Sequence, residues 1–183
     1  MDIEPTRLAA WRLATQELAD VAAALDETSY DAFARHFDQL GITGRGFFTG
    51  QGRSGLIAQM AAMRFMHLGA KAHMVGEATA PSISAGDALV VISGSGATPV
   101  SLSFAGIAQR AGAAVLAVTT QPDSPLARLA DAALCLPIGS HLQFGGTVFE
   151  QSSLILLDSI VLDQMRIRGV PAETMGTNHT TFQ

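Results

Sequence analysis

The stretch Val90-Val91-Ile92-Ser93-Gly94-Ser95-Gly96-Ala97-Thr98-Pro99 decides the fold. Its first three residues continue Leu89 in a short apolar, β-branched run, which is typical of a strand buried on both faces of a parallel sheet. The run stops in a loop of glycines and serines. Thr98 and Pro99 then predict a helix that begins directly after the loop, with Thr98 as its N-cap. The stretch therefore predicts a strand, a glycine loop and a helix N-terminus in immediate succession.

This succession is suited to binding an anion. Glycine adopts backbone conformations closed to other residues, so successive N–H groups can converge on one point, and the helix N-terminus adds unpaired donors. Serine and threonine hydroxyls without a lysine favour a phosphate monoester over a nucleoside triphosphate. The alternative is a tight turn whose serines only cap the helix, but one cap needs one hydroxyl and the loop carries three. The expected phosphate-binding residues are Ser93, Gly94, Ser95, Gly96, Ala97 and Thr98.

Length and composition bound the class of protein. The 183 residues suit one domain, expected to span residues 1–183, and 48% hydrophobic against 15% charged residues favours an oligomer. The net charge of −5 without a basic cluster makes nucleic acid and anionic membranes poor partners. Asp2 and Glu4 precede any apolar run, so we expect no signal peptide and a cytoplasmic protein. Cys135, the single cysteine, excludes a disulfide framework and is expected to be a small buried core residue.

A second glycine loop, Gly50-Gln51-Gly52-Arg53-Ser54-Gly55, lies between the predicted strand Gly46–Thr49 and the predicted helix Leu56–Leu68. It matches the G-x-G-x-x-G fingerprint of dinucleotide-binding proteins, and Glu77 lies at about the distance of the expected acidic residue. Against a dinucleotide, little chain remains for a substrate domain. Arg53-Ser54 also offers a cation and a hydroxyl to a phosphate. Both interpretations stay open on the residues alone; for a phosphosugar site the contributors are Gly52, Arg53 and Ser54.

The remaining chain alternates predicted strands and helices after a helical arm at residues 1–40 that covers the sheet or meets another subunit. This alternation predicts an α/β fold with a parallel sheet and helices on both faces. Ligands gather at the carboxyl ends of such strands, where both glycine loops lie, so their chemistry is expected to converge. The remaining predicted strands are Lys71–Val75, Ala113–Val118 and Asp131–Leu136, and the remaining helices Pro99–Ala111, a short one from Ser124-Pro125 to Ala130, and a long one ending near Arg168.

Three residues could carry acid–base chemistry. Thr147-x-x-Glu150 is a capping-box pattern at the start of the long helix, which gives Glu150 a structural role. Glu150 could equally be a general base, because the helix dipole holds a carboxylate in the first turn ionised and a closed site keeps it basic. His67, near the end of a helix, is more typical of a packed residue or a dipole partner. His179 lies in the polar C-terminal tail, residues 170–183, where a histidine is usually solvated.

Taken together and in order, several motifs resemble the 6-phospho-3-hexuloisomerases of the sugar isomerase (SIS) family. The similarity runs from the first strand to the long helix. Ser-Gly-Ser-Gly-x-Thr marks the wider family, and the Met-Arg and Phe-Glu-Gln motifs are more specific. The motifs are Gly50-x-Gly52-Arg53-Ser54-Gly55, Ala62-Met63-Arg64-x-Met66-His67-Leu68-Gly69, Val75-Gly76-Glu77, Ile92-Ser93-Gly94-Ser95-Gly96-x-Thr98 and Phe149-Glu150-Gln151.

The resemblance implies a three-layer α/β sandwich with a five-stranded parallel sheet, assembled as a homotetramer, with no cofactor and no metal. The implied reaction interconverts D-arabino-3-hexulose 6-phosphate and fructose 6-phosphate through a 2,3-enediol, in the ribulose monophosphate route of formaldehyde handling. We expect Glu150 to be the base. His179, reaching from a neighbouring subunit, is the expected partner, with His67 the fallback.

The sequence also departs from the family pattern. Ala97 replaces a more usual polar residue, and Phe144–Val148 and the tail match poorly, which loosens the substrate assignment more than the reaction class. Another phosphosugar substrate, a phosphosugar-binding domain without catalysis and a dinucleotide-binding domain remain the alternatives.

Overall fold

The five predicted strands form one sheet, and every pairing in it is parallel. The computed structural model describes residues 7–40 and 44–181. The strand order is β2-β1-β3-β4-β5, so β3 returns to the far side of β1 from β2. The strands are β1 (Arg45–Gly50), β2 (Lys71–Met74), β3 (Ala88–Ile92), β4 (Ala114–Thr119) and β5 (Ala132–Cys135).

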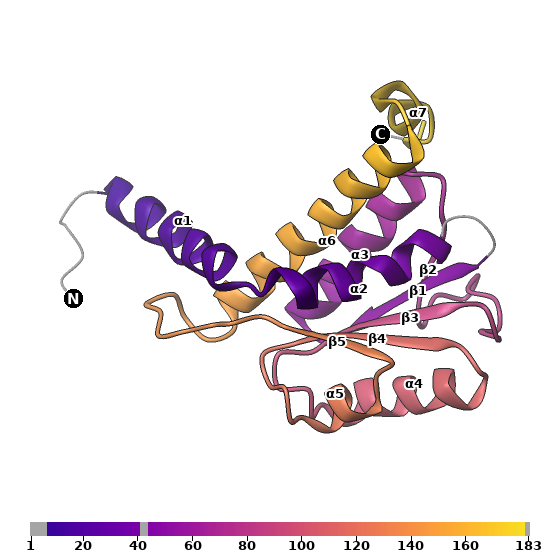
Figure 1. Ribbon diagram of the computed structural model, residues 1–183, viewed down its shortest axis with the longest axis horizontal. Coiled ribbons are helices and arrows are strands. Elements are labelled where there is room, and N and C mark those ends of the chain that lie inside the picture. Colours follow the sequence, from indigo (N-terminus) through magenta and orange to yellow (C-terminus); the bar gives the residue numbers. More distant parts are fainter. Residues whose placement is uncertain (1–6, 41–43, 182–183) are drawn as a thin grey trace.

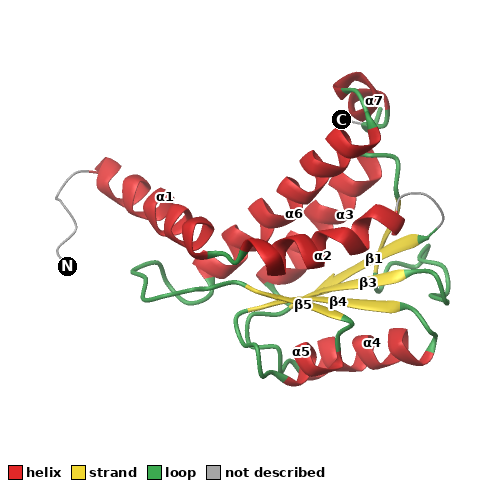
Figure 2. Cartoon of the chain, viewed as in Figure 1, coloured by secondary structure: helices red, strands yellow, loops and turns green. Residues whose placement is uncertain are grey.

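Helices cover both faces of this sheet and make the predicted three-layer α/β sandwich (Figures 1 and 2). The helices α2, α3 and α6 lie on one face, and α4 and α5 lie on the other. The helices are α1 (Arg7–Ala24), α2 (Glu27–Leu40), α3 (Arg53–His67), α4 (Pro99–Arg110), α5 (Pro125–Leu129), α6 (Thr147–Arg168) and α7 (Ala172–Thr177). Among these described helices, none combines the length and apolar character that a membrane crossing requires.

The strand β3 is buried along its whole length, as its apolar run predicts. Because side chains alternate along a strand, Val90 and Ile92 pack into the core under α2, α3 and α6. Leu89 and Val91 pack into the second core under α4 and α5. The continuous run is therefore needed because both faces of β3 are covered.

The predicted N-terminal arm divides into two parts. On α2, Phe33 and Phe37 are each 1% exposed and belong to the core, so this helix covers the sheet. The helix α1 extends away from the sheet (Figure 1), and only its second half, through Val21, reaches the core. Leu8 and Trp11 remain 54% and 69% exposed. The first six residues of the predicted arm lie outside the described chain.

One local prediction is wrong. Cys135 is only partly buried, because it ends the edge strand β5 rather than lying inside the sheet. The predicted C-terminal tail contains a short helix, α7, which packs against α3. The last two residues of that tail, 182 and 183, are outside the described chain.

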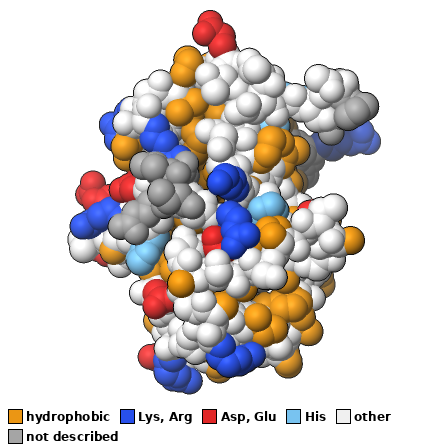
Figure 3. Space-filling model, turned by 90° about the vertical axis from the view of Figure 1, so that its right-hand side faces the viewer, with side chains coloured by type: hydrophobic (Ala, Val, Ile, Leu, Met, Phe, Trp, Pro, Cys, Tyr) orange, Lys and Arg blue, Asp and Glu red, His pale blue; other side chains and the backbone are white. Residues whose placement is uncertain are grey.

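On the face seen in Figure 3, basic, acidic and hydrophobic side chains are interspersed over the described surface.

Candidate active site

The two glycine loops leave neighbouring strands at the same edge of the sheet. Gly50, the last residue of β1, is in register with Ile92, the last residue of β3. Because β1 and β3 are adjacent while the chain passes through β2 between them, this edge is the point where the strand order reverses. Ligands of open α/β sheets bind in the crevice at such a point. The two loops therefore begin at the same edge of the sheet, as the sequence predicts.

The first loop folds back tightly on itself. A Cβ atom on Gly50 would lie 2.6 Å from the backbone of Ser54, and Gly52 adopts a φ of +58°, so neither position suits a side chain. The helix α3 begins at Arg53, three residues earlier than predicted. Arg53 and Ser54 therefore lie in the first turn of a helix, whose N–H groups have no partner within the helix. This turn offers donors, a guanidinium group and a hydroxyl at one place.

The second loop is held by the last residue of β4 and by residues that follow this strand, none of which was predicted to belong to the site. The Gly94 carbonyl accepts hydrogen bonds from Thr119 Oγ1 at 3.1 Å and from Thr120 N and Oγ1 at 3.1 and 2.9 Å. A Cβ atom on Gly96 would lie 2.1 Å from Ser124 Oγ, and Gly96 has a φ of +58°. The signal for these residues was their place at the end of the strand next to β3, with hydroxyl side chains.

Thr98 occupies the N-cap position of α4, with Pro99 as the first helical residue, but its side chain forms no cap hydrogen bond. Its Oγ1 lies 3.3 Å from Ser93 Oγ instead. The exposed Ser95 accepts only a 3.3 Å hydrogen bond from Ala97 N. In the described chain, the amides of Gly94, Ser95 and Thr98 donate to no protein acceptor. The loop therefore presents these three amides together with hydroxyls whose hydrogen bonds stay within the loop.

The predicted capping box of α6 is wrong. The N-cap is Gly146, so Thr147 is already inside the helix, and its Oγ1 donates to the Phe144 carbonyl at 2.6 Å. The Glu150 carboxylate instead forms an ion pair with Arg53 in the first turn of α3. The side chain of Glu150 is 15% exposed, whereas that of Arg53 is 62% exposed. Glu150 is thus free of the capping role and directed to the first glycine loop.

A packing contact joins α6 to the second loop as well. A Cβ atom on Gly94 would lie 3.2 Å from the ring of Phe149, the neighbour of Glu150. The absence of a side chain at Gly94 therefore lets the start of α6 approach the loop. Together with the Arg53–Glu150 ion pair, this contact brings the starts of α3 and α6 and the β3–α4 loop to one place. We call this place the carboxyl-edge site.

His67 and His179 lie together, but at the other end of α3. Their rings stack with centroids 4.9 Å apart, and Asn178 Nδ2 donates to the His67 carbonyl at 2.9 Å. Fourteen residues separate His67 from Arg53, which places the two ends of the helix about 21 Å apart at 1.5 Å per residue. Within one chain, neither histidine is therefore brought to Glu150.

His67 is a packed residue, as its helical position predicts, and is 2% exposed. Burial lowers the pKa of its imidazole, and the neighbouring His179 and Arg64 lower that pKa further. The Arg64 Nη1 atom lies 3.5 Å from His67 Nδ1. The burial and these two neighbours therefore favour the neutral form of His67 over its charged form.

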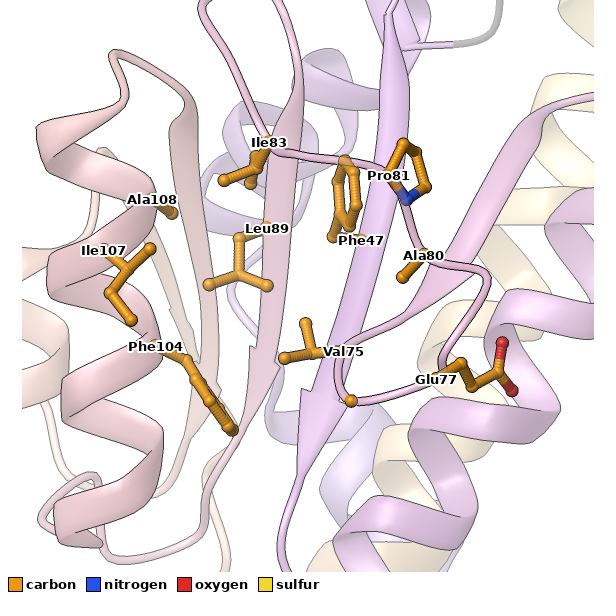
Figure 4. A pocket seen from close by; sticks show the side chains of 11 residues that line it. Phe47, Val75, Glu77, Ala80, Pro81, Ile83, Leu89, Phe104, Ile107 and Ala108 are labelled. Atoms are coloured by element: carbon orange, nitrogen blue, oxygen red, sulfur yellow. The ribbon is translucent and has the colours of Figure 1, made fainter.

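Glu77, the acidic residue of the dinucleotide interpretation, follows β2 and lies at the rim of a separate cavity of about 250 Å³. This cavity is lined by apolar side chains such as Phe47, Leu89 and Phe104, from the face of the sheet that α4 covers. Figure 4 shows the Glu77 carboxylate directed away from these side chains. No group of three or more metal-binding side chains is arranged around one point in residues 7–40 and 44–181.

Comparison with known proteins gives a consistent result. The chain is 42% identical to a 3-hexulose-6-phosphate isomerase of Mycobacterium gastri over 179 residues, which cover 93% of this chain and 88% of the relative. It is 35% identical to a 3-hexulose-6-phosphate isomerase of Bacillus subtilis, over 91% of this chain and 94% of the relative.

A solved structure has the same fold. It is the structure of a protein from Methanococcus jannaschii, from which a molecular function of 3-hexulose-6-phosphate isomerase was inferred. The two structures superpose with a TM-score of 0.83 at 26% identity, over 95% of this chain and 99% of that one. The SIS domain model matches residues 43–162, which include both glycine loops and about the first three-quarters of α6. The chain therefore belongs to the SIS domain family.

Proposed function

We propose that the protein is a sugar-phosphate isomerase that interconverts D-arabino-3-hexulose 6-phosphate and fructose 6-phosphate through a 2,3-enediol. The observation that carries this proposal is the largely buried Glu150 carboxylate, which caps no helix and is paired with Arg53 beside the two glycine loops. Relatives at 42% and 35% identity that are named 3-hexulose-6-phosphate isomerases support the choice of substrate.

In this proposal the substrate phosphate binds at the β3–α4 loop and the start of α3. The hydroxyls of Ser93, Ser95 and Thr98, the amides of the loop, and Ser54 supply the donors. Arg53 exchanges its ion pair with Glu150 for one with the phosphate, because its side chain is largely exposed. The backbone at Gly52, Gly94, Gly96 and Ala97 approaches the ligand. Phosphate binding supplies energy remote from the reacting carbons, which orients them.

Glu150 performs the proton transfer. It removes the proton from C2 of the 3-hexulose and leaves an enediolate over C2 and C3. It then returns a proton to C3, while the hydroxyl proton passes from O2 to O3 and the carbonyl group forms at C2. Departure of Arg53 to the phosphate frees the carboxylate for this step. A donor near the two oxygens stabilises the enediolate, and His179 of a neighbouring subunit is the proposed donor, since His179 of the same chain lies at the far end of α3.

The proposed assembly is a homotetramer of single SIS domains in the cytoplasm, with residues 1–40 as the helical arm and 170–183 as the tail. The exposed Leu8 and Trp11 on α1 favour an assembly that covers them. No cofactor is assigned to the reaction, because a carboxylate and a hydrogen-bond donor suffice for an enediol isomerisation.

Turnover of 3-hexulose 6-phosphate by the purified protein tests the proposal. Fructose 6-phosphate should also raise the melting temperature, whereas NAD and NADP should not. In D2O the enzyme should exchange the C3 proton of fructose 6-phosphate, because the reverse reaction begins there. Stabilisation by fructose 6-phosphate without turnover or exchange would replace the proposal by a phosphosugar-binding domain. Stabilisation by a dinucleotide alone would refute it altogether.

A further inference from the structure

The buried side of α1 carries one carboxylate that the proposed reaction does not use. Glu17 is 9% exposed and lies one turn before Val21, through which α1 reaches the core. Burial alone would raise the pKa of Glu17, but the hydrogen bonds that it accepts from the loop between β5 and α6, the one from Leu142 above all, outweigh burial and lower that pKa. The loop therefore favours the ionised form of a carboxylate that lies on another element.

Glu17 attaches this loop, residues 137–146, to α1. We call these residues the β5–α6 loop. The amide of Leu142 donates a hydrogen bond to Glu17 Oε1 at 2.5 Å. Figure 1 shows the loop running out toward α1 before it returns to the start of α6. Of the elements that the structure describes, only α1, through Glu17, and α6 itself form hydrogen bonds with residues 139–146.

The loop has little other support on this side. A cavity of about 270 Å³ lies between α1 and the first half of the loop, and its lining includes Asp20 of α1 and residues 137–141. Farther along the loop, the side chains of Leu142 and Phe144 are 49% and 95% exposed. Because apolar packing does not hold this part of the loop, its position depends on the attachment to Glu17.

A short series of contacts leads from this attachment to the Glu150 carboxylate. The Phe144 carbonyl accepts hydrogen bonds from Thr147 N and Oγ1 at 3.3 and 2.6 Å, which joins the end of the loop to the first turn of α6. The carbonyl of Gly146, the N-cap, accepts a hydrogen bond from Glu150 N at 2.9 Å. A Cβ atom on Gly146 would lie 3.5 Å from Glu150 Oε1, so the loop backbone lies against the carboxylate. A displacement of the loop would therefore move this carboxylate.

We propose that Glu17 is a positioning residue for Glu150, because it holds the β5–α6 loop so that the start of α6 keeps the orientation in which Glu150 meets Arg53. The loop needs an anchor before Gly145, which has a φ of +59° and the backbone freedom of a glycine. Glu17 precedes residues 43–162, which the SIS domain model matches, so this role belongs to the helical arm. The catalytic consequence rests on the proposed function, whereas the anchoring of the loop does not.

Amide hydrogen exchange tests the anchor without any reference to catalysis. In Glu17→Ala, peptides from residues 139–150 should exchange at least about tenfold faster than in the parent protein, because the loop loses a hydrogen bond to a charged group. Asp20→Ala is the matched control: Asp20 lines the same cavity, but its side chain accepts a hydrogen bond from Gln16 and none from the loop. Unchanged exchange in Glu17→Ala, or equal acceleration in Asp20→Ala, would overturn the anchor.

Steady-state kinetics tests the positioning role. Glu17→Ala should lower kcat about tenfold to a hundredfold, because a catalytic group misplaced by about 1 Å can cost that much. KM should stay close to that of the parent protein, because the proposed phosphate donors lie on the β3–α4 loop and at the start of α3. Glu17→Gln should recover most of kcat, since its amide oxygen can accept the hydrogen bond from Leu142 N. An unchanged kcat in Glu17→Ala, or equal losses in both variants, would contradict the positioning role.

Asp87→Ala separates positioning from a general loss of stability. Asp87 is a second largely buried carboxylate, but its partner Arg45 begins β1, at the opposite end of the strand from the site. Asp87→Ala should lower the melting temperature at least as much as Glu17→Ala and leave kcat unchanged at a temperature where both variants are folded. Equal losses of kcat in the two variants would show that Glu17 acts only through stability. If the parent protein proves inactive as an isomerase, the proposed function fails, and exchange in residues 139–150 still decides whether Glu17 holds the loop.

Discussion

The amino end of the sheet and its carboxyl end each hold an arginine beside a carboxylate, Arg45 with Asp87 and Arg53 with Glu150. At the amino end, Asp87 accepts hydrogen bonds from Arg45 N, Nε and Nη2 and from Ser84 N and Oγ, and its side chain is 5% exposed. At the carboxyl end, Glu150 meets an arginine whose side chain is 62% exposed.

The difference distinguishes an ion pair suited to a structural role from one whose arginine is exposed enough to exchange with a ligand. Burial alone would raise the pKa of Asp87, but the hydrogen bonds from Arg45 and Ser84 outweigh it and lower that pKa. Neither Arg45 nor Asp87 can leave this ion pair without leaving the charge of the other unpaired. Arg53 can leave Glu150 for a phosphate at little cost, since exposed ion pairs are worth about 0–1 kcal/mol. Four predictions test this contrast, from the largest expected effect to the smallest.

The largest effect is expected at Glu150. Glu150→Gln keeps the volume of the side chain and loses the ability to take a proton, so kcat should fall by about 10²–10⁴. Because the side chain caps no helix, the melting temperature should stay close to that of the parent protein. Steady-state kinetics and proton exchange at C3 of fructose 6-phosphate measure the effect. Exchange at the parent rate would show that the base is another residue.

At the amino end of the sheet, loss of the Arg45–Asp87 ion pair should lower the stability of the protein and not its activity. Asp87→Ala removes one partner of a largely buried ion pair and should lower the free energy of unfolding by about 2–3 kcal/mol. This loss is smaller than for a fully buried ion pair, because the Arg45 side chain is partly exposed. Urea denaturation measures this, and KM for the sugar phosphate should not change. Asp158→Ala, which breaks a pair exposed on both sides, is the matched control and should cost less than 1 kcal/mol. Equal losses for the two variants would remove the distinction.

Substitutions in the β3–α4 loop should weaken substrate binding and leave the stability of the fold unchanged. Ser95→Ala and Thr98→Ala each remove a hydroxyl that is proposed to donate a hydrogen bond to a charged phosphate oxygen. Such a hydrogen bond is worth about 1.5–3 kcal/mol, so KM should rise roughly tenfold to a hundredfold. Because the Thr98 side chain forms no cap hydrogen bond, the melting temperature of the Thr98→Ala protein without ligand should remain that of the parent protein. Ser103→Ala, farther along α4, is the control. An unchanged KM in both loop variants would exclude the phosphate interpretation.

The smallest effect concerns pH and lies at the far end of α3. The pKa of His67 is lowered from its ordinary value of 6.5 in the folded protein, so the unfolded chain binds this proton first as the pH falls. The contribution of His67 to stability is therefore complete above pH 6.5 and decreases below it. His67→Gln should reduce the loss of stability between about pH 6.5 and 5. The same pH dependence in this variant and in the parent protein would contradict this.

Much of the fold follows from short-range patterns. The run through β3 predicts a strand covered on both faces, and the glycine loops predict a site at the carboxyl edge. Each is a property of a few consecutive residues whose spacing matches one structure. The starts of α3 and α6 were less predictable, because a shift of one or two residues decides whether Thr147 is a cap or an interior residue. That shift depends on how Gly146 and Phe149 pack.

The candidate active site depends on contacts between residues that are distant in the sequence. Nothing near Arg53 indicates that its partner is Glu150, 97 positions later, and nothing in the tail indicates that His179 stacks on His67. The hydrogen bonds from Thr119 and Thr120 to Gly94 were missed for the same reason. Strand order determines these neighbours, and local pattern does not specify strand order.

The burial of β3 on both faces also governs how the protein can open. Since Val90 and Ile92 belong to one core and Leu89 and Val91 to the other, neither helical layer can detach without exposing half of the strand. The two layers should consequently unfold in one cooperative step, and the β3 amides should be among the slowest to exchange with solvent. The glycine loop that begins at Ser93 is thus tethered to the most protected segment of the chain. Its mobility can be confined to the few bonds between Ser93 and Thr98, so that a ligand can order the loop without perturbing the remainder of the domain.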